Sequence, residues 1–327
     1  MFVGSGKHVG PARMRVAGME NVEEWVGIHG SIASGKSTLM KRIKRYIRAH
    51  KMDATDPAHI DPTQPNKVYV LLVKEPVKEW NTPRFRLPKR QQPQQQPAGV
   101  VAINQSNDTD IGGGSDTEAS QESPPTTQSS SPISTEQEEE EDEKLWSMLG
   151  IFCADKVGMG FEFQVYVFNS RLQELMRRLD MVAPSDFPRR IVILSERTML
   201  SDRVFYHTVA RLNADSKAPY HEQRLYIYNQ FSATICDDVL ERERRLVYLP
   251  TSPPVCSTRQ KERDRDGEHC SEDYLQRLDD EHQRMVQRFS EERGEDAVIR
   301  MDRFDACFTV EEVDEEVRVL MERLFPS

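Results

Sequence analysis

The stretch Gly30-Ser31-Ile32-Ala33-Ser34-Gly35-Lys36-Ser37 decides the fold, because it matches the pattern G-x-x-x-x-G-K-[ST]. An apolar run, Trp25 to Ile28, precedes this stretch, and a helical pattern begins near Lys36. A strand, a glycine-rich turn and a helix in this order form a loop that cradles phosphate with backbone N–H groups and a helix N-terminus. We expect Lys36 to neutralise the outer phosphates and Ser37 to bind Mg²⁺. The predicted nucleotide-binding residues of the loop are Gly30, Ser31, Ala33, Ser34, Gly35, Lys36, Ser37 and Thr38.

Short apolar runs alternate with amphipathic helical stretches along the rest of the chain. The five runs expected to be buried parallel strands are 25–28, 68–73, 191–195, 246–249 and 298–301. Apolar residues at helical spacing between Val313 and Leu324 predict a last helix that packs one face on the core. Strands that alternate with helices are typical of an α/β fold with a doubly wound parallel sheet.

One internal segment has the composition of a disordered insertion. Residues 82–143 contain a Gln/Pro run, a triple glycine and a Ser/Pro/Thr tract. They hold four basic and twelve acidic residues, which accounts for −8 of the net charge of −10. Such a segment buries too little apolar surface to offset the entropy of ordering. We therefore expect one folded domain over 24–327, interrupted by this segment and preceded by a disordered tail over 1–23.

Composition excludes several classes of protein. No run of about 18 apolar residues is present, so we expect no membrane-spanning helix. The folded part is nearly neutral, which argues against binding to a nucleic acid polymer. The five cysteines are scattered without C-x-x-C spacing, which indicates a reducing compartment rather than a disulfide scaffold. We expect a cytoplasmic protein, with the mitochondrion as the alternative because Lys7, Arg13 and Arg15 precede the first acidic residue.

Charged residues follow two of the predicted strands directly. Glu75-Pro76-Val77-Lys78-Glu79-Trp80 ends the second strand, and Glu196-Arg197-Thr198 ends the third. The carboxyl ends of parallel strands border the crevice in which doubly wound folds bind ligands. Either segment alone could be a plain surface cap, but together they place acidic and basic groups beside the phosphate-binding loop.

The order of these motifs resembles the deoxynucleoside kinase family over about residues 24–81 and 144–325. The motifs that carry the resemblance are the glycine-rich loop, E-P-V-x-x-W, F-x-F-Q, E-R-[ST] followed by S-D-R, and an arginine-rich segment near residue 263. The resemblance implies a P-loop kinase with a five-stranded parallel sheet flanked by helices and an arginine-rich lid. It also implies Mg²⁺, ATP or another nucleoside triphosphate as phosphate donor, a deoxynucleoside substrate and a homodimer.

The resemblance also implies roles for individual residues. Glu75 looks like the general base for the sugar 5'-hydroxyl, Arg197 holds that oxygen and Glu75 in register, and Glu196 lies near Mg²⁺. Trp80, Phe163 and Gln164 contact the base, since two apolar rings and one amide suit a base edge. The alternative for Phe161 and Phe163 is core packing on a helix expected over 161–179.

The resemblance also implies roles for one further pair of residues and for the lid. Arg171 and Asp202 form a pair over the base that is typical of the deoxycytidine and purine deoxynucleoside branch, and the alternative is an ordinary salt bridge. In the lid, Arg263 and Arg265 clamp phosphates, Arg259 lies against adenine and Glu268 bonds the sugar 3'-hydroxyl. The alternative for the lid is a solvated charged helix.

The chain departs from the family pattern at three places. Thr198 replaces a serine but keeps the hydroxyl, and Cys153 stands where relatives often have a tyrosine that binds the 3'-hydroxyl. The segment after Glu268 is one residue shorter and lacks a proline. We therefore expect sugar recognition to differ most from that of relatives.

Three functions are compatible with these motifs. The first is a kinase that converts deoxynucleosides, above all deoxycytidine or purine deoxynucleosides, to their 5'-monophosphates. The second is a nucleoside monophosphate kinase, which needs a further basic site for the phosphate of its acceptor. The third is a degenerate nucleotide-binding regulator, against which Lys36, Ser37, Glu75 and Arg197 argue.

Overall fold

The structure is a computed structural model that describes residues 18–64, 66–86, 145–182, 189–263, 270–304 and 309–326, without the side chains of 86 and 235–240. Five parallel strands form one sheet in the order β2-β5-β1-β6-β7. They are β1 (Val22–His29), β2 (Val68–Val73), β5 (Arg190–Glu196), β6 (Glu243–Tyr248) and β7 (Val298–Arg300). The α/β fold with a five-stranded parallel sheet is thereby confirmed.

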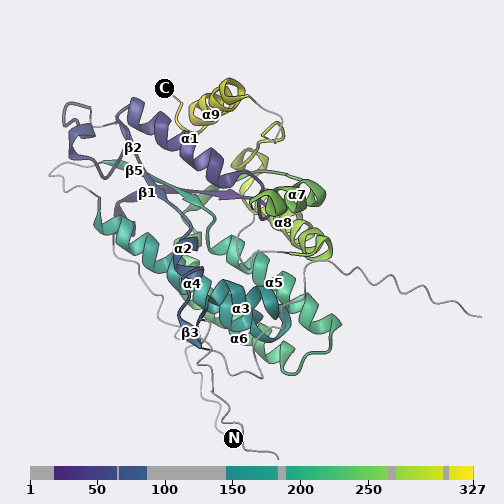
Figure 1. The fold of residues 1–327 in the computed structure, drawn as a ribbon. Coiled ribbons are helices and arrows are strands. Elements are labelled where there is room, and N and C mark those ends of the chain that lie inside the picture. The colour runs from purple at the N-terminus through teal and green to yellow at the C-terminus, as the bar shows by residue number, and fades with distance from the viewer. Residues whose placement is uncertain are drawn as a thin grey trace, which may run out of the picture. The chain divides into compact units, whose positions relative to one another are not determined.

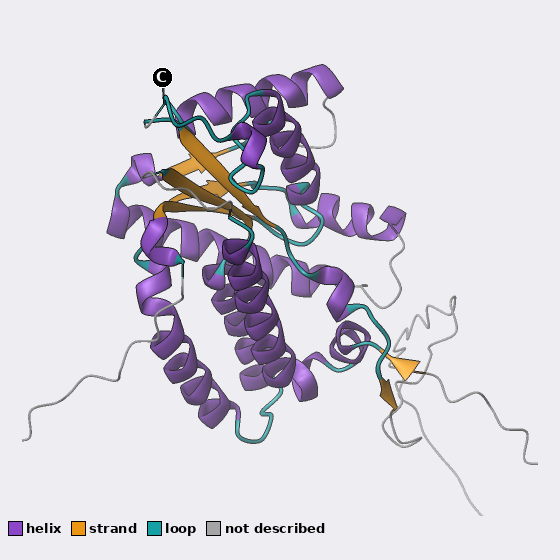
Figure 2. Cartoon of the chain, turned by 90° about the vertical axis from the view of Figure 1, so that its left-hand side faces the viewer, coloured by secondary structure: helices purple, strands orange, loops and turns teal. Residues whose placement is uncertain are grey.

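Helices cover both faces of this sheet (Figures 1 and 2). The helices are α1 (Lys36–Ala49), α2 (Val77–Trp80), α3 (Met148–Ala154), α4 (Lys156–Asp180), α5 (Met199–Asp215), α6 (His221–Leu240), α7 (Pro253–Arg263), α8 (Glu272–Arg293) and α9 (Val310–Leu324). Short 3-10 turns lie at Met19–Asn21, Pro57–His59 and Glu295–Ala297, and β3 (Phe85–Arg86) pairs with β4 (Leu145–Trp146). Among the described residues, no helix is long and apolar enough to cross a membrane.

Two apolar clusters hold the helices to the two faces of the sheet. On one face, α1 and α9 pack on strand residues such as Val26, Ile28 and Leu194, all of which are fully buried. On the other face, α4 packs through Phe168 and Leu175. Burial of this apolar surface supplies the main stabilising free energy of such a domain. The strands between the clusters are buried on both faces, which explains their nearly continuous apolar sequences.

The predicted elements agree with the observed ones apart from their ends. The run 68–73 is β2 without change, whereas β1 begins at Val22, three residues before the predicted strand and two before the predicted domain boundary at residue 24. Helix α4 begins at Lys156, where Asp155 accepts a hydrogen bond from the backbone of Gly158 at 2.7 Å. Asp at this position caps the free N–H groups of a helix start. Of the predicted insertion 82–143, residues 82–86 are described and the remainder lies outside the described residues.

Contacts divide the chain into two units. One comprises residues 1–85 and 145–327, and the other comprises residues 86–144, of which only Arg86 is described. All strands of the five-stranded sheet and all helices of the described residues belong to the first unit. The candidate site therefore lies within a single unit.

Candidate active site

A cavity of about 760 Å³ lies at the carboxyl ends of the central strands. Segments far apart in the sequence line it: the loop between β1 and α1, the segment after β2, the helices α3 and α4, the end of β5 and the helix α7. Parallel strands end at a common edge, so residues that follow different strands meet there. The predicted site residues that line this cavity are Ala33, Ser34, Gly35, Lys36, Ser37, Thr38, Glu75, Trp80, Phe163, Gln164, Arg171, Glu196, Arg197, Asp202, Arg259 and Arg263.

The loop between β1 and α1 has the backbone of a phosphate cradle. Gly30 and Gly35 have φ values of 146° and 94°, and Ala33 between them has a φ of 62°. A Cβ on Gly30 would lie 2.8 Å from the carbonyl oxygen of Leu249, so only glycine fits there. No side chain caps the N-terminus of α1. The first N–H groups of this helix therefore lack a side-chain acceptor, as an anion-binding site requires.

Lys36 is folded back onto the loop. Its Nζ donates to the carbonyl oxygens of Gly30 at 3.1 Å and Ser31 at 2.6 Å, and to Ser34 Oγ at 3.1 Å. Burial and the nearby charge of Arg197 lower the pKa of Lys36 to about 7. Its direct contacts are neutral oxygens, and the charges of Glu75 and Glu196 offset only part of the effect of burial on the ammonium. A bound phosphate would add negative charge and favour the protonated form.

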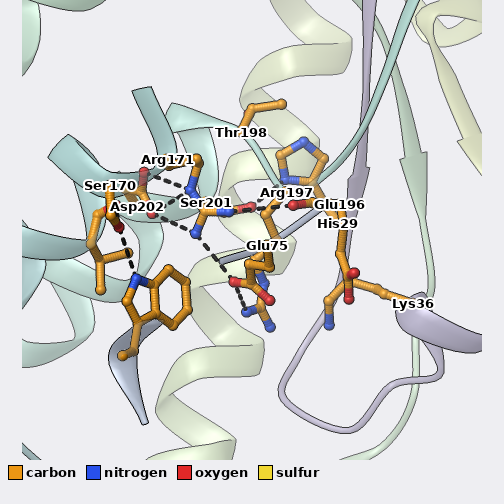
Figure 3. A network of polar contacts seen from close by, with 12 residues as sticks. His29, Lys36, Glu75, Ser170, Arg171, Glu196, Arg197, Thr198, Ser201 and Asp202 are labelled. Carbon is orange, nitrogen blue, oxygen red and sulfur yellow. Dashed lines mark hydrogen bonds and ion pairs between the residues drawn. The ribbon is translucent and has the colours of Figure 1, made fainter. Parts of the chain in front are cut away.

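Glu75 lies at the centre of the site, between two arginines (Figure 3). Its Oε1 accepts from Arg197 Nη1 at 3.0 Å and from Arg171 Nη2 at 3.2 Å. Burial alone would raise the pKa of Glu75, but the charges of Arg197, Arg171 and Lys36 outweigh burial and lower it. The carboxylate is therefore ionised and has a fixed orientation in the cavity.

Arg171 and Asp202 form the predicted pair, and the pair is buried. Arg171 Nε lies 3.0 Å from Asp202 Oδ2, and Nη2 lies 3.0 Å from Oδ1. Both side chains are less than 5 % exposed. Burial disfavours the charged guanidinium, but Asp202 and Glu75 more than compensate and raise the pKa of Arg171. The bidentate geometry orients Arg171 so that the same group reaches Glu75.

Aromatic rings and one amide form the part of the cavity on α2, α3 and α4. Trp80 contacts Phe163 edge to face at 6.4 Å between centroids, and its Nε1 donates to Ser170 Oγ at 2.8 Å. Phe152 stacks on Phe163 at 4.4 Å. Gln164 is 1 % exposed, and its Oε1 has no hydrogen-bond partner among the described residues. An unpartnered buried amide oxygen is costly, so a ligand that donates to it would bind favourably.

Ser37 and Glu196 provide oxygen ligands that fit Mg²⁺. Ser37 Oγ donates to Glu196 Oε1 at 2.6 Å, and both residues line the cavity beside the phosphate-binding loop. No group of three or more His, Cys, Asp or Glu side chains among the described residues could hold a metal ion. Mg²⁺ needs no such group, because it binds through one or two protein oxygens, waters and substrate phosphates.

The lid is described in part. Arg259 on α7 donates from Nη1 to the carbonyl oxygen of Ala33 at 3.3 Å, and Arg263 ends this helix at the cavity. Arg259 therefore contacts the phosphate-binding loop, and Arg263 lines the same cavity. The predicted residues Arg265 and Glu268 lie outside the described residues.

Several residues of the site were not predicted. Lys74 and Phe205 line the cavity, and Phe205 lies under the Arg197 guanidinium, which is 4.6 Å from the ring centroid. Lys74 immediately precedes Glu75 at a strand end, so its position in the sequence could have indicated it. Tyr274 on α8 is buried, and its hydroxyl has no partner in the described part of the chain. Burial and the nearby thiols of Cys270 and Cys153 raise its pKa. Both cysteines line the cavity, whereas Tyr274 does not.

Comparison with known proteins decides the family. The sequence model described as "Deoxynucleoside kinase" matches residues 126–323, which is more than half of the chain. The chain belongs to the deoxynucleoside kinase family. No curated protein matches this kinase significantly.

Solved structures of a deoxyadenosine kinase from M. mycoides are also similar to this kinase. The structure with bound dCTP and the structure with bound dATP each have a TM-score of 0.49 and 15% identity. The structure with the products dCMP and a flexible dCDP has a TM-score of 0.49 and 16% identity. Each alignment covers 92% of this chain and 98% of the other chain.

Proposed function

We propose that this kinase transfers the γ-phosphoryl group of ATP or another nucleoside triphosphate to the 5'-hydroxyl of a deoxynucleoside. The observation that carries this proposal is that one cavity holds both an ionised Glu75, paired with Arg197, and the phosphate-binding loop with Lys36. The family membership supports the same reaction class.

The chain's own residues account for the steps. Glu75 accepts the proton of the 5'-hydroxyl as that oxygen forms a bond to the γ-phosphorus, and the bond from the γ-phosphorus to the bridging oxygen breaks. The products are a nucleoside diphosphate and a deoxynucleoside monophosphate. Arg197 fixes the carboxylate of Glu75, and Lys36 offsets the charge on the phosphates. Catalysis of this kind depends mainly on positioning and charge stabilisation, so a base of low pKa is adequate.

Ser37 and Glu196 are the residues proposed to hold Mg²⁺. When bound, Mg²⁺ neutralises charge on the phosphate oxygens. Arg259 and Arg263 add positive charge on the side of α7. A site that already contains these charges loses little energy to reorganisation during the reaction.

The preferred acceptors are proposed to be deoxycytidine or purine deoxynucleosides. Gln164 offers an amide with an unpartnered oxygen, and Trp80 and Phe163 offer apolar rings. The Arg171–Asp202 pair adjoins these groups, because the Arg171 guanidinium lies 5.6 Å from the Trp80 ring centroid. Each of these bases carries an exocyclic amine or a ring N–H that can donate to the amide oxygen of Gln164, but thymine also has a ring N–H, so the preference rests on the Arg171–Asp202 pair.

The experiment uses the full chain and a panel of acceptors. The purified protein is incubated with Mg²⁺, one of the four γ-labelled ribonucleoside triphosphates in turn, and each of the four deoxynucleosides, and in parallel with each deoxynucleoside monophosphate. We expect label in dCMP or a purine deoxynucleoside monophosphate. Label only in diphosphates would favour a nucleoside monophosphate kinase, and no label with any triphosphate would favour the nucleotide-binding regulator.

A further inference from the structure

A second polar cluster lies behind the cavity and is fully buried. His29 Nε2 lies 2.9 Å from Glu243 Oε1, and His29 Nδ1 lies 2.8 Å from Ser201 Oγ. Thr198 Oγ1 donates to the same Glu243 oxygen at 3.1 Å. All four side chains have an exposed fraction of 0 %. Figure 3 shows His29, Thr198 and Ser201 next to the site residues.

This cluster contains a hydroxyl, an imidazole and a carboxylate in series, as hydrolytic triads do. Nucleophilic catalysis requires contact with a substrate, and none of the four residues lines the cavity. Any effect of the cluster on the reaction must therefore pass through neighbouring residues that line the cavity.

A carboxylate oxygen accepts, so His29 Nε2 and Thr198 Oγ1 both donate to Glu243 Oε1. The other ring nitrogen of His29, Nδ1, bonds to Ser201 Oγ. Glu243 thus fixes two segments at once, although 214 residues separate it from His29.

Each segment continues directly into the site. His29 precedes Gly30 of the phosphate-binding loop, Thr198 follows Arg197, and Ser201 precedes Asp202. Arg197 has a φ of 64°, a left-handed conformation that an arginine adopts only when its surroundings hold it. The backbone N–H of Arg197 donates to the carbonyl oxygen of Ile28 at 3.0 Å. The next residue, Thr198, is held by the bond from its side chain to Glu243.

Gly27 provides the room for this cluster. A Cβ at Gly27 would lie 2.2 Å from Glu243 Oε1, 2.3 Å from His29 Nε2 and 2.8 Å from Thr198 Cγ2. The side chains of Glu243 and His29 meet beside Gly27 of β1, so this position of the strand requires a residue without a Cβ. A buried carboxylate is costly for the fold unless it is paired. Oε1 of Glu243 is bonded by His29 and Thr198, whereas Oε2 has no partner among the described residues.

We propose that Glu243, together with His29, is a positioning unit that holds the Arg197–Thr198 turn and thereby keeps the Arg197 guanidinium on Glu75. This inference rests on the proposed function, because its kinetic effect is read on phosphoryl transfer. Glu243 and His29 are positioning residues, since neither reaches the cavity.

The test compares variants that remove the hydrogen bond between Thr198 Oγ1 and Glu243 Oε1 with variants that keep it. Thr198→Val removes the hydroxyl at constant shape, and Thr198→Ser keeps it. Glu243→Met removes the acceptor, and Glu243→Gln keeps one amide oxygen in its place. We expect kcat to fall about 10-fold to 100-fold in Thr198→Val and Glu243→Met. The Kd for ATP should change less than about twofold, and the two conservative variants should recover most of kcat.

A double-variant cycle separates positioning from general stability. If both residues act through one contact, Thr198→Val combined with Glu243→Met lowers kcat no further than the more severe single change. A lowered melting temperature with unchanged kcat well below that temperature would overturn the proposal. The Thr198 hydroxyl also accepts from the backbone N–H of Leu200 at 3.2 Å and so caps α5, which makes the Glu243 variants necessary beside the Thr198 pair. If Glu243→Met does not fold, Glu243→Ala, which also removes the acceptor, takes its place.

A crystal structure of Thr198→Val provides a readout that does not depend on the reaction. We expect Arg197 to leave its left-handed conformation and its contact with Glu75. An unchanged Arg197 in that structure contradicts the positioning role, even if the wild-type protein phosphorylates no deoxynucleoside. Absence of wild-type activity would contradict only the proposed function.

Discussion

Glu75 and Arg197 are 122 residues apart in the sequence, and their side chains lie 3.0 Å apart in the site. Glu75 follows the edge strand β2, whereas Arg197 follows β5, the strand that lies between β2 and β1. The parallel sheet brings both residues to one edge, and the left-handed conformation of Arg197 is part of the turn that begins α5. The contact between Glu75 and Arg197, and its position in the same cavity as Lys36, leads to the following predictions.

The affinity for the phosphate donor should depend on the protonation of Lys36. Burial and Arg197 lower the pKa of Lys36 to about 7 in the free protein, and phosphates favour the protonated form. We therefore expect kcat/KM for ATP to be highest below pH 7 and to fall up to tenfold per pH unit above it, while kcat changes less. The measurement is the pH profile of both parameters between pH 6 and 9. In Lys36→Arg this alkaline fall should disappear from the residual activity, and its persistence would assign the fall to another group.

Gln164→Leu should weaken the acceptor without weakening the fold. The Oε1 of Gln164 is buried and unpartnered, which costs about 1–3 kcal/mol in the free protein. We expect a melting temperature equal to or above that of the wild type, and kcat/KM for the deoxynucleoside at least about 10-fold lower. Gln173→Leu, an exposed change on the same helix, is the control. A large loss of stability together with unchanged kcat/KM would show that Gln164 is only a core residue.

The Arg171–Asp202 pair should be sensitive to the loss of one partner. Asp202→Asn leaves a buried guanidinium with less than its full counter-charge, so we expect the free energy of unfolding to fall by about 3–5 kcal/mol. Replacement of both residues, Arg171→Met with Asp202→Leu, should restore much of the stability but not the activity. Urea unfolding measures these changes.

The control for this pair is Arg177→Met, which breaks an exposed ion pair with Glu174 at 2.7 Å. Exposed pairs contribute less than about 1 kcal/mol. Equal effects of Asp202→Asn and Arg177→Met would contradict a tightly held pair in the site.

Removal of the Ser37 hydroxyl should affect the metal requirement. Ser37→Ala leaves Glu196 without its 2.6 Å donor and takes away one oxygen ligand. We expect the Mg²⁺ concentration for half-maximal activity to rise about 10-fold to 100-fold. Ser216→Ala, at the end of α5 and away from the cavity, should have no such effect. Activity that persists in excess EDTA would contradict the metal requirement itself.

Local sequence was sufficient to predict most of the fold. The phosphate-binding loop is a contiguous motif, and strands buried on both faces have apolar runs that need no tertiary information. Element ends were less predictable, because α4 begins at a cap formed by Asp155 and not at the first apolar residue. For the site, motif order indicated Glu75, Arg197 and the Arg171–Asp202 pair.

Contacts between distant residues without a motif could not be predicted. Glu243 precedes the apolar part of β6 and reads as an ordinary charged residue at the start of a strand. Only the parallel register of β1 and β6, together with the space left by Gly27, brings it to His29. Tyr274 was missed for a similar reason, since its helix shows an ordinary amphipathic pattern.

The most direct test of the central claim is the turnover of Glu75→Gln measured together with its affinity for ATP. Loss of the proton acceptor should lower kcat by at least about 100-fold, while the Kd for ATP changes less than about twofold, because the phosphate-binding loop is untouched. Glu79→Gln, a matched change one helical turn away whose side chain accepts from Tyr166, should keep wild-type kcat. A Glu75→Gln enzyme that retains more than about a tenth of wild-type kcat would contradict the role of Glu75 and the mechanism that depends on it.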